Sequence, residues 1–266
     1  MREISSRVDR GRERVLALNG LSVVIVGGGS GLGLLLAQMA VEQSAASVGI
    51  IDIDANAAKA ALVPASLANI PSAMAACDIQ TSEAAHAAFS QVAKELGRVD
   101  SVINCAAIYP RKPILEITDA EWDVSNAVNI KGTFHVCVAA IKQFRVQQTH
   151  DAITGRIVNI SSVDAFKAHP QNAHYAATKA AVVSLTKSFA QEVAPDNILV
   201  NSVAPAGMAT EKARESGFLN ELAAASPLGR GGEPREMAEW VLMAAGPKNT
   251  YMTGENIIVS GGYIYA

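Results

Sequence analysis

Short apolar runs alternate with helix-period segments along nearly the whole chain. The first run, residues 23–26, is rich in β-branched side chains and leads into a glycine-rich turn and then a leucine-rich helical segment. A continuous apolar run is typical of a parallel strand buried on both faces. Further strands are predicted at residues 47–51, 72–77, 100–104, 156–161, 197–203 and 256–260, and helices at residues 34–40, 55–67, 81–96, 119–144, 174–193, 211–225 and 234–245.

This alternation predicts an α/β fold, a single-domain doubly wound parallel sheet of about seven strands with helices on both faces. Right-handed crossovers place the carboxyl ends of the strands at one edge of the sheet, where a ligand site is expected. Residues 1–19 are expected to form a polar N-terminal extension, and residues 20–266 one domain without an internal linker.

Composition narrows the classes of function. The chain has 266 residues, of which 50% are hydrophobic and 18% charged, and its net charge is −3. Without a long basic run we expect no nucleic-acid partner. Without an apolar stretch of ~20 residues or a secretory leader we expect no membrane partner and a cytoplasmic location. The three cysteines are far apart in the sequence, so we expect no metal site and no disulfide, and each cysteine is expected to be a small buried residue.

The turn after the first strand is a candidate phosphate-binding site. Gly27, Gly31 and Gly33 permit a tight turn and let backbone amides and a helix N-terminus approach a pyrophosphate closely. An ordinary strand-to-helix turn is the alternative, because glycine spacing alone is a weak signal.

An acidic residue at the end of the next strand supports a dinucleotide site. Asp52 follows Gly33 by nineteen residues, close to the ~20 expected for a carboxylate that binds the adenosine ribose. Asp52 would repel a 2′-phosphate and Ser30 in the turn offers no cation, so the pattern favours NAD over NADP. Asp54 is a second candidate for the ribose, although it is better explained as the N-cap of the following helix.

Tyr175 and Lys179 are four residues apart, so they share one face of a predicted helix. An ammonium ~5 Å from the phenol would favour the phenolate by roughly 3 kcal/mol, or about two pKa units. The spacing therefore predicts a tyrosine with a lowered pKa that can act as a general base near neutral pH. A solvent-exposed pair on a helix is the alternative.

With Ser162 thirteen residues before Tyr175, the chain resembles the short-chain dehydrogenase/reductase family over about residues 21–263. The family turn Thr-Gly-x-x-x-Gly-x-Gly is matched at residues 26–33, with Val26 in place of the threonine. The family Asn-Asn-Ala-Gly motif is matched at residues 104–107 with two positions changed, one of them Cys105, and the Pro-Gly motif at residues 205–207 with Ala206 displacing the glycine. We expect these departures to affect cofactor affinity more than proton transfer.

The resemblance implies site residues and a mechanism. Tyr175 would exchange a proton with the substrate oxygen while a hydride passes between substrate and nicotinamide, and Ser162 would bind the same oxygen. Lys179 would lower the pKa of the tyrosine and bind the ribose, and Asn129 would support a water that links Lys179 to solvent. The catalytic residues would be Asn129, Ser162, Tyr175 and Lys179. The residues implied to bind the cofactor, NAD, are Gly27, Gly29, Ser30, Gly31, Leu32, Gly33, Asp52, Ile53, Asp78, Ile79, Asn104, Ala106, Tyr175, Lys179, Pro205, Gly207, Met208 and Thr210.

Loops near these residues would form the substrate pocket. His169 and His174, beside Asp164 and Lys167, are candidates to contact a polar substrate, with exposed loop residues as the alternative. The rest of the wall is expected from Tyr109, Arg111, Lys112, Met208 and residues 211–225.

Three functions are open at this stage: an NAD-dependent dehydrogenase of a small secondary alcohol or reductase of its ketone, a 3-oxoacyl thioester reductase, and an NAD-sensing binding protein without turnover. Apolar residues on more than one face of the helices at 119–144 and 174–193 favour a homo-oligomer. By resemblance this would be a homotetramer, with residues 263–266 near an interface.

Overall fold

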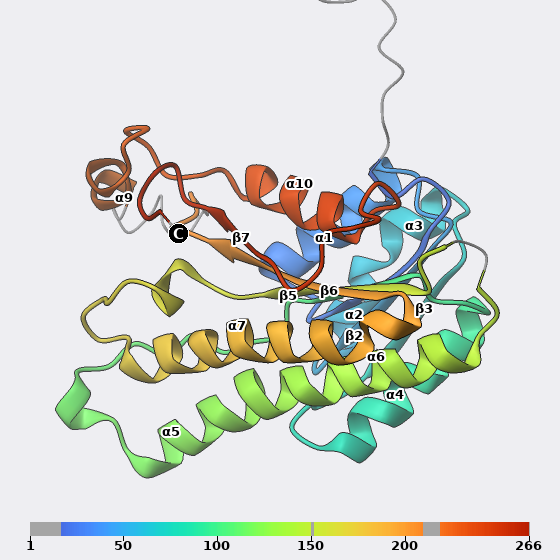
Figure 1. Cartoon of the computed structure of the whole chain (residues 1–266), viewed down its shortest axis with the longest axis horizontal. Coiled ribbons are helices and arrows are strands. Elements are labelled where there is room, and N and C mark those ends of the chain that lie inside the picture. The colour runs from blue at the N-terminus through green and yellow to red at the C-terminus, as the bar shows by residue number, and fades with distance from the viewer. Residues whose placement is uncertain (1–16, 150–151, 210–218, 266) are drawn as a thin grey trace, which may run out of the picture.

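The structure is a computed structural model that describes residues 17–149, 152–209 and 219–265. Its centre is a seven-stranded sheet with strand order β3-β2-β1-β4-β5-β6-β7, in which every neighbouring pair is parallel (Figure 1). The strands are β1 (Ser22–Val26), β2 (Ser47–Asp52), β3 (Ser72–Ala76), β4 (Ser101–Asn104), β5 (Gly155–Ile160), β6 (Ile198–Pro205) and β7 (Asn256–Val259). The predicted doubly wound parallel sheet is confirmed, because the order reverses between β1 and β4.

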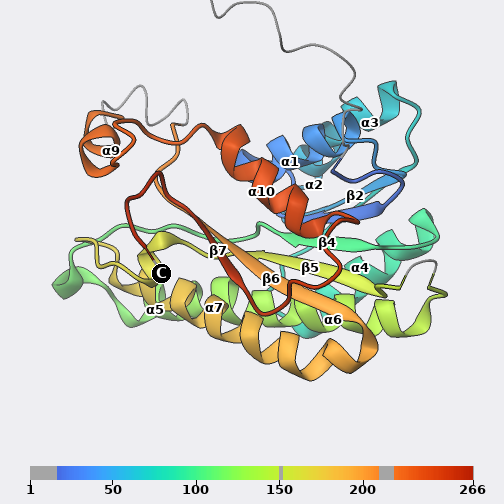
Figure 2. The same cartoon turned by 45° about the horizontal axis from the view of Figure 1, so that its top comes forward.

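Helices cover both faces of the sheet (Figures 1 and 2). The helices are α1 (Gly31–Glu42), α2 (Ala55–Ala61), α3 (Val63–Leu67), α4 (Ser82–Leu96), α5 (Asp119–Asn126), α6 (Thr133–Val146), α7 (Ala173–Val193), α9 (Leu219–Ala225) and α10 (Pro234–Ala245). One hydrophobic core joins the sheet to α4, α6 and α7, and a second joins it to α1, α2, α3 and α10. Burial of both faces explains why the central strands are apolar runs without alternation.

The helix predicted at residues 55–67 is wrong in one respect, because the chain forms two short helices there. α2 ends at Ala61 with Leu62 as its C-cap, and α3 begins at Val63 with Pro64 in its first turn. Proline has no N–H to donate to the carbonyl four residues earlier, so the first helix cannot continue through it.

The long helix predicted at residues 119–144 is likewise interrupted. Between α5 and α6 the residues Ala127–Gly132 form a π-helical segment, a wider turn with one extra residue. An extra residue rotates the following side chains relative to those of α5, and Asn129 lies within this turn. Local distortions of this kind are frequent at functional sites.

The first described residues belong to the domain. Leu18 is fully buried in the core, and its N–H donates to the carbonyl of Gln43. The N–H of Ala17 donates to the Gln43 side chain at 2.9 Å. Residues 1–16 of the predicted extension lie outside the described residues.

Two sequence-level questions can be answered for the described residues. None of the helices there is both long and apolar enough to cross a bilayer, and no three of their His, Cys, Asp or Glu side chains are grouped as metal ligands would be. Cys77 and Cys137 are buried as predicted, whereas Cys105 is only half-buried, and all three are free thiols.

Candidate active site

The turn between β1 and α1 requires glycine at two positions. Gly27 has a φ of +73°, and a Cβ there would lie 2.6 Å from the backbone nitrogen of Ala106. A Cβ on Gly33 would overlap the carbonyl oxygen of Gly27. The glycines therefore pack the start of α1 tightly against the ends of β1 and β4.

The N-terminus of α1 is suited to bind an anion. Ser30 is the N-cap, but its side chain accepts no hydrogen bond from the helix, and the first turn contains no acidic residue. The first N–H groups of α1 have no hydrogen-bond partner within the helix, because no carbonyl group precedes them by one turn. A Cβ on Gly31 would meet nothing within 4 Å, so the space above the turn is open. These features fit the pyrophosphate of a dinucleotide.

Asp52 lies beside this turn. Its Oδ2 accepts a hydrogen bond from the Gly29 N–H at 2.8 Å, and its Oδ1 accepts one from the Asp54 N–H at 3.0 Å. A carboxylate has about four acceptor positions, so Asp52 can still bind a ribose hydroxyl. Asp54 instead accepts from the N–H groups of Asn56 and Ala57 at 2.8 and 3.1 Å, which confirms its role as the N-cap of α2.

Other predicted cofactor residues follow the strands at the same edge. Ile53 is 72% exposed directly after β2, and exposed Asp78 binds the side chain and N–H of Gln80 in the loop after β3. Ile79 is buried, and the side chain of Asn104 donates to Thr133 Oγ1 at 3.2 Å. The Oδ1 of Asn104 is buried without a hydrogen-bond partner. An unpaired buried acceptor is costly, so a donor from a ligand would stabilise this site.

Asn129 joins three segments of the site. Its Nδ2 donates to the carbonyl oxygen of Ile108 and to Thr178 Oγ1, both at 3.0 Å, and its Oδ1 accepts from the Ile108 N–H at 2.9 Å. The π-helical turn is what points this side chain toward α7. The buried asparagine therefore fixes the loop after β4 against α7. Its role in supporting a water relay stays a prediction.

Ser162, Tyr175 and Lys179 come together as predicted. Ser162 follows β5 and caps the 3₁₀ turn Val163–Ala165. Lys179 Nζ lies 5.6 Å from the centroid of the Tyr175 ring and donates to the carbonyl oxygen of Ile160 at 2.6 Å. The phenol and the ammonium thus lie one helical turn apart and next to the serine loop.

The predicted lowering of the Tyr175 pKa is wrong for the protein alone. Burial raises the pKa of Tyr175 above its ordinary value of 10; a hydrogen bond with Ser162 opposes this rise, and the nearby Asp164 and Tyr109 add to it. Burial also lowers the pKa of Lys179 from 10.5 to about 8. The attraction between the phenolate and the ammonium lowers the Tyr175 pKa, but removing the phenolate from water raises that pKa by more.

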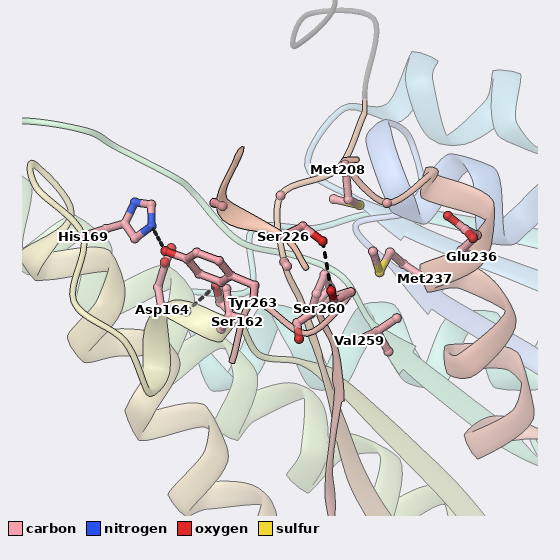
Figure 3. A pocket seen from close by; sticks show the side chains of 18 of the residues that line it. Ser162, Asp164, His169, Met208, Ser226, Glu236, Met237, Val259, Ser260 and Tyr263 are labelled. Atoms are coloured by element: carbon pink, nitrogen blue, oxygen red, sulfur yellow. Dashed lines mark hydrogen bonds between the residues drawn. The ribbon is translucent and has the colours of Figure 1, made fainter. Parts of the chain in front are cut away.

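A cavity of about 1020 Å³ lies at the carboxyl ends of β5, β6 and β7 (Figure 3). Pro205, Gly207 and Met208 line it, as do Ser162 and Tyr175. Thr210 and residues 211–218 of the wall predicted at residues 211–225 lie outside the described residues. The remaining wall includes Tyr109, Arg111, Asp164, His169, Glu221, Ala225, Ser226, Leu228, Met237, Trp240, Val259, Ser260 and Tyr263.

Two candidates for the substrate pocket do not line it. Lys112 forms an ion pair with Glu121 at 2.7 Å, and this bond holds the loop after β4 to α5. His174 is 1% exposed and does not line the cavity. Tyr263 lines the cavity although the sequence suggested only an interface for it, because nothing in the pattern shows where the last residues of a chain fold back.

The comparisons with known proteins agree with this geometry. A family model described as Enoyl-(Acyl carrier protein) reductase matches residues 27–264. Short-chain reductase protein NovJ from Streptomyces niveus is 31% identical over 248 residues, which cover 90% of this chain and 92% of that protein. The 3-oxoacyl-(acyl-carrier-protein) reductase FabG of Chlamydia muridarum is 30% identical over 244 residues, which cover 91% of this chain and 96% of that protein.

A solved structure of NAD⁺-bound xylitol dehydrogenase superposes with a TM-score of 0.83 at 25% identity, over 92% of this chain and 99% of that one. This chain therefore combines the parallel sheet, the glycine turn and the four polar residues with similarity to reductases and dehydrogenases over nearly its full length. The chain belongs to the short-chain dehydrogenase/reductase family of oxidoreductases.

Proposed function

We propose that this protein is an NAD-dependent dehydrogenase of a small secondary alcohol, or in reverse a reductase of the matching ketone. The observation that carries the proposal is that Ser162 and Tyr175 line one cavity and Lys179 lies beside Tyr175, at the same sheet edge as Asp52. That arrangement provides a proton-exchanging phenol beside a site for a dinucleotide with a free ribose. A nicotinamide cofactor, when bound, supplies the hydride acceptor or donor.

The residues of the chain would then divide the remaining work. The Ser162 hydroxyl binds and orients the substrate oxygen, and the Tyr175 phenol gives a proton to that oxygen or takes one from it. Lys179 holds positive charge close to the phenol and stabilises its ionised form. Asn129 keeps the loop after β4 and α7 in register through its three hydrogen bonds.

Asp52 is the basis for NAD rather than NADP. A carboxylate at the end of β2 accepts hydrogen bonds from ribose hydroxyls and repels a 2′-phosphate. Ser30 in the adjacent turn supplies no positive charge to offset that repulsion. The NAD⁺ bound to the xylitol dehydrogenase that this chain resembles supports the same choice.

Reduction of a 3-oxoacyl thioester is the second candidate, and the name of the Chlamydia muridarum relative favours it. The cavity is large enough for part of an acyl chain. A sensor without turnover is the third, and the intact proton-exchanging residues weigh against it.

One experiment separates the three candidates. Wild-type protein is assayed for NADH formation over a panel of secondary alcohols, and for oxidation of NADH and NADPH with acetoacetyl-coenzyme A. We expect NADH formation with at least one alcohol and its loss in Tyr175→Phe, by ~10²- to 10⁴-fold, with NAD binding retained. Turnover only with NADPH and the thioester would favour the second candidate, and NADH binding without turnover the third.

The same proposal includes a homotetramer. Trp122, Val124 and Phe134 on α5 and α6 are 40%, 48% and 45% exposed. Apolar side chains of this size on neighbouring helices are typical of a surface covered by another subunit.

A further inference from the structure

A carboxylate lies in the cavity two positions after the catalytic serine. The N–H of Asp164 donates to Ser162 Oγ at 3.1 Å, and its Oδ2 accepts from Asn172 Nδ2 at 2.6 Å. Asn172 is 1% exposed, so its amide is held in place by packing. Asp164 is therefore fixed through both its backbone and its side chain, and it lines the cavity beside the reacting groups.

Asp164 forms no ion pair with another residue in the part of the chain that the structure describes. The ion pairs found there join Arg98, Lys112, Arg145, Arg230 and Arg235 to other acids. Within the same residues, the Oδ1 of Asp164 receives no hydrogen bond. An ionised carboxylate only accepts hydrogen bonds, so a substrate group that faces Asp164 must be a donor.

A second polar pair lies next to Asp164. His169 Nε2 and Tyr263 Oη are hydrogen-bonded at 2.5 Å, and Lys167 Nζ lies 3.7 Å from the centroid of the Tyr263 ring. In either tautomer of His169 the Tyr263 oxygen keeps hydrogen-bonding capacity for a further partner. The Lys167 ammonium over that ring disfavours a positively charged substrate group at this place.

The cavity has two chemically different sides (Figure 3). Asp164, His169 and Tyr263 lie on one side together with Ser162, and Met208, Met237 and Val259 lie on the other, where Glu236 is paired with Arg230. A substrate held at Ser162 therefore has unpaired polar groups close to its reacting carbon, and methionine and valine side chains with an ion pair farther away.

We propose that Asp164 and the His169–Tyr263 pair form a hydroxyl-binding wall that selects substrates with a second hydroxyl group close to the reacting carbon. The substrate class is a polyhydroxylated secondary alcohol or its hydroxyketone, and this inference rests on the proposed dehydrogenase function. A carboxylate in the substrate is repelled by Asp164. The oxygen atoms beside the ketone of a 3-oxoacyl thioester only accept hydrogen bonds, so the same wall disfavours that substrate.

The test compares substrates of one size in the presence of NAD: butane-2,3-diol, butan-2-ol and 3-hydroxybutyrate. We expect kcat/KM for the diol to exceed that for the other two by about 10-fold or more, because a site built around a hydroxyl leaves polar groups unpaired without it. In Asp164→Asn the amide oxygen can still accept from Asn172 while the NH₂ group faces the cavity. The preference for the diol should fall by about 10- to 100-fold.

Two further variants make the test decisive. Tyr263→Phe keeps the ring under Lys167 but removes the hydroxyl, and should lower the preference for the diol by about 10-fold. Glu95→Gln makes the same change in charge as Asp164→Asn on the exposed face of α4, and should leave all three substrates unaffected. NADH binding, measured by fluorescence, shows whether each variant is folded.

The outcomes distinguish the hydroxyl-binding wall from the proposed dehydrogenase function. Equal kcat/KM for diol and butan-2-ol in the wild type, or an unchanged ratio in both Asp164→Asn and Tyr263→Phe, overturns the hydroxyl-binding wall and leaves the dehydrogenase intact. Absence of NADH formation from every alcohol overturns the proposed function itself. If Asp164→Asn does not bind NADH, the wild-type ratio and Tyr263→Phe decide the question.

Discussion

Replacing Lys179 by methionine should stabilise the fold while it impairs catalysis. The side chain is 4% exposed, and burial lowers its pKa from 10.5 to about 8. At about 1.4 kcal/mol per pH unit, this difference means that folding with a charged Lys179 costs about 3 kcal/mol. Loss of its hydrogen bond to the Ile160 carbonyl oxygen offsets about 1 kcal/mol, so Lys179→Met should be more stable by about 2 kcal/mol at pH 7.

The sign of the pH dependence follows from the lowered pKa. Below pH 8 the lysine is charged in both states and the full cost is present, whereas between about 8 and 10.5 the unfolded chain binds more protons than the folded one. Wild-type stability therefore gains from rising pH in this window and Lys179→Met does not. Cys105 and Tyr175 lie near Lys179 and also titrate at high pH. The prediction therefore concerns the difference in stability between wild type and Lys179→Met, and not the pH dependence of either protein alone.

The assay is thermal or urea unfolding at fixed protein concentration, at pH 7 and near pH 10. At pH 7 the melting temperature of Lys179→Met should be higher by about 4 to 8 °C, and near pH 10 the gap should nearly close. Lys187→Met on the exposed face of the same helix is the control and should change stability by less than about 0.5 kcal/mol. A variant less stable than the wild type at pH 7, or an advantage that does not shrink with pH, would refute the reasoning.

Three other changes test the cofactor site, the π-helical turn and the assembly. Asp52→Ala should raise the KM for NAD by about 10- to 100-fold and relax discrimination against NADP. Steady-state kinetics with both cofactors would disprove this if the ratio of kcat/KM for NAD to that for NADP were the same as in the wild type. Asn129→Ala removes three hydrogen bonds and leaves the N–H and carbonyl groups of half-buried Ile108 without these partners, whereas Thr178 Oγ1 keeps its bond to the Tyr175 carbonyl oxygen. The free energy of unfolding should fall by about 2 to 3 kcal/mol, and an unchanged urea midpoint would contradict that. Light scattering should give about four times the chain mass of 27.8 kDa, and a stable monomer at micromolar concentration would end the tetramer proposal.

The strands and the edge that holds the site could be predicted because their signals are local. Burial on both faces requires uninterrupted apolar residues, and the turn at Gly27 and Gly33 requires residues without a Cβ. The break at Pro64 follows from the same kind of local rule, although the alanine-rich pattern around it continues without interruption. The π-helical turn around Asn129 could not be read, because one extra residue in a turn hardly changes a period averaged over many residues.

Contacts between distant segments account for the other differences. Lys112 pairs with Glu121, and His169 with Tyr263, across loops whose paths depend on the whole fold. Asp164 lines the cavity and Lys167 does not, and the sequence does not show which of the two faces it. The residues that line a pocket depend on such contacts, whereas the motif residues are recognised from local spacing, so the sequence is informative about the type of reaction and much less so about the substrate.

The charges around Tyr175 connect the type of reaction with the choice of substrate. Burial, Asp164 and Tyr109 all favour the protonated phenol in the protein alone, which is the form needed to give a proton to a carbonyl oxygen. Taking a proton from an alcohol requires the opposite form, which is favoured by the hydrogen bond with Ser162 and by the Lys179 ammonium, 5.6 Å from the ring centroid. An oxidised nicotinamide bound beside the phenol would add positive charge in the same sense, so a single cavity can hold Tyr175 as an acid for reduction and as a base for oxidation. A carboxylate at position 164 works against the second role, and its presence so close to the reacting groups is understandable if the substrate itself provides the hydroxyl that binds it.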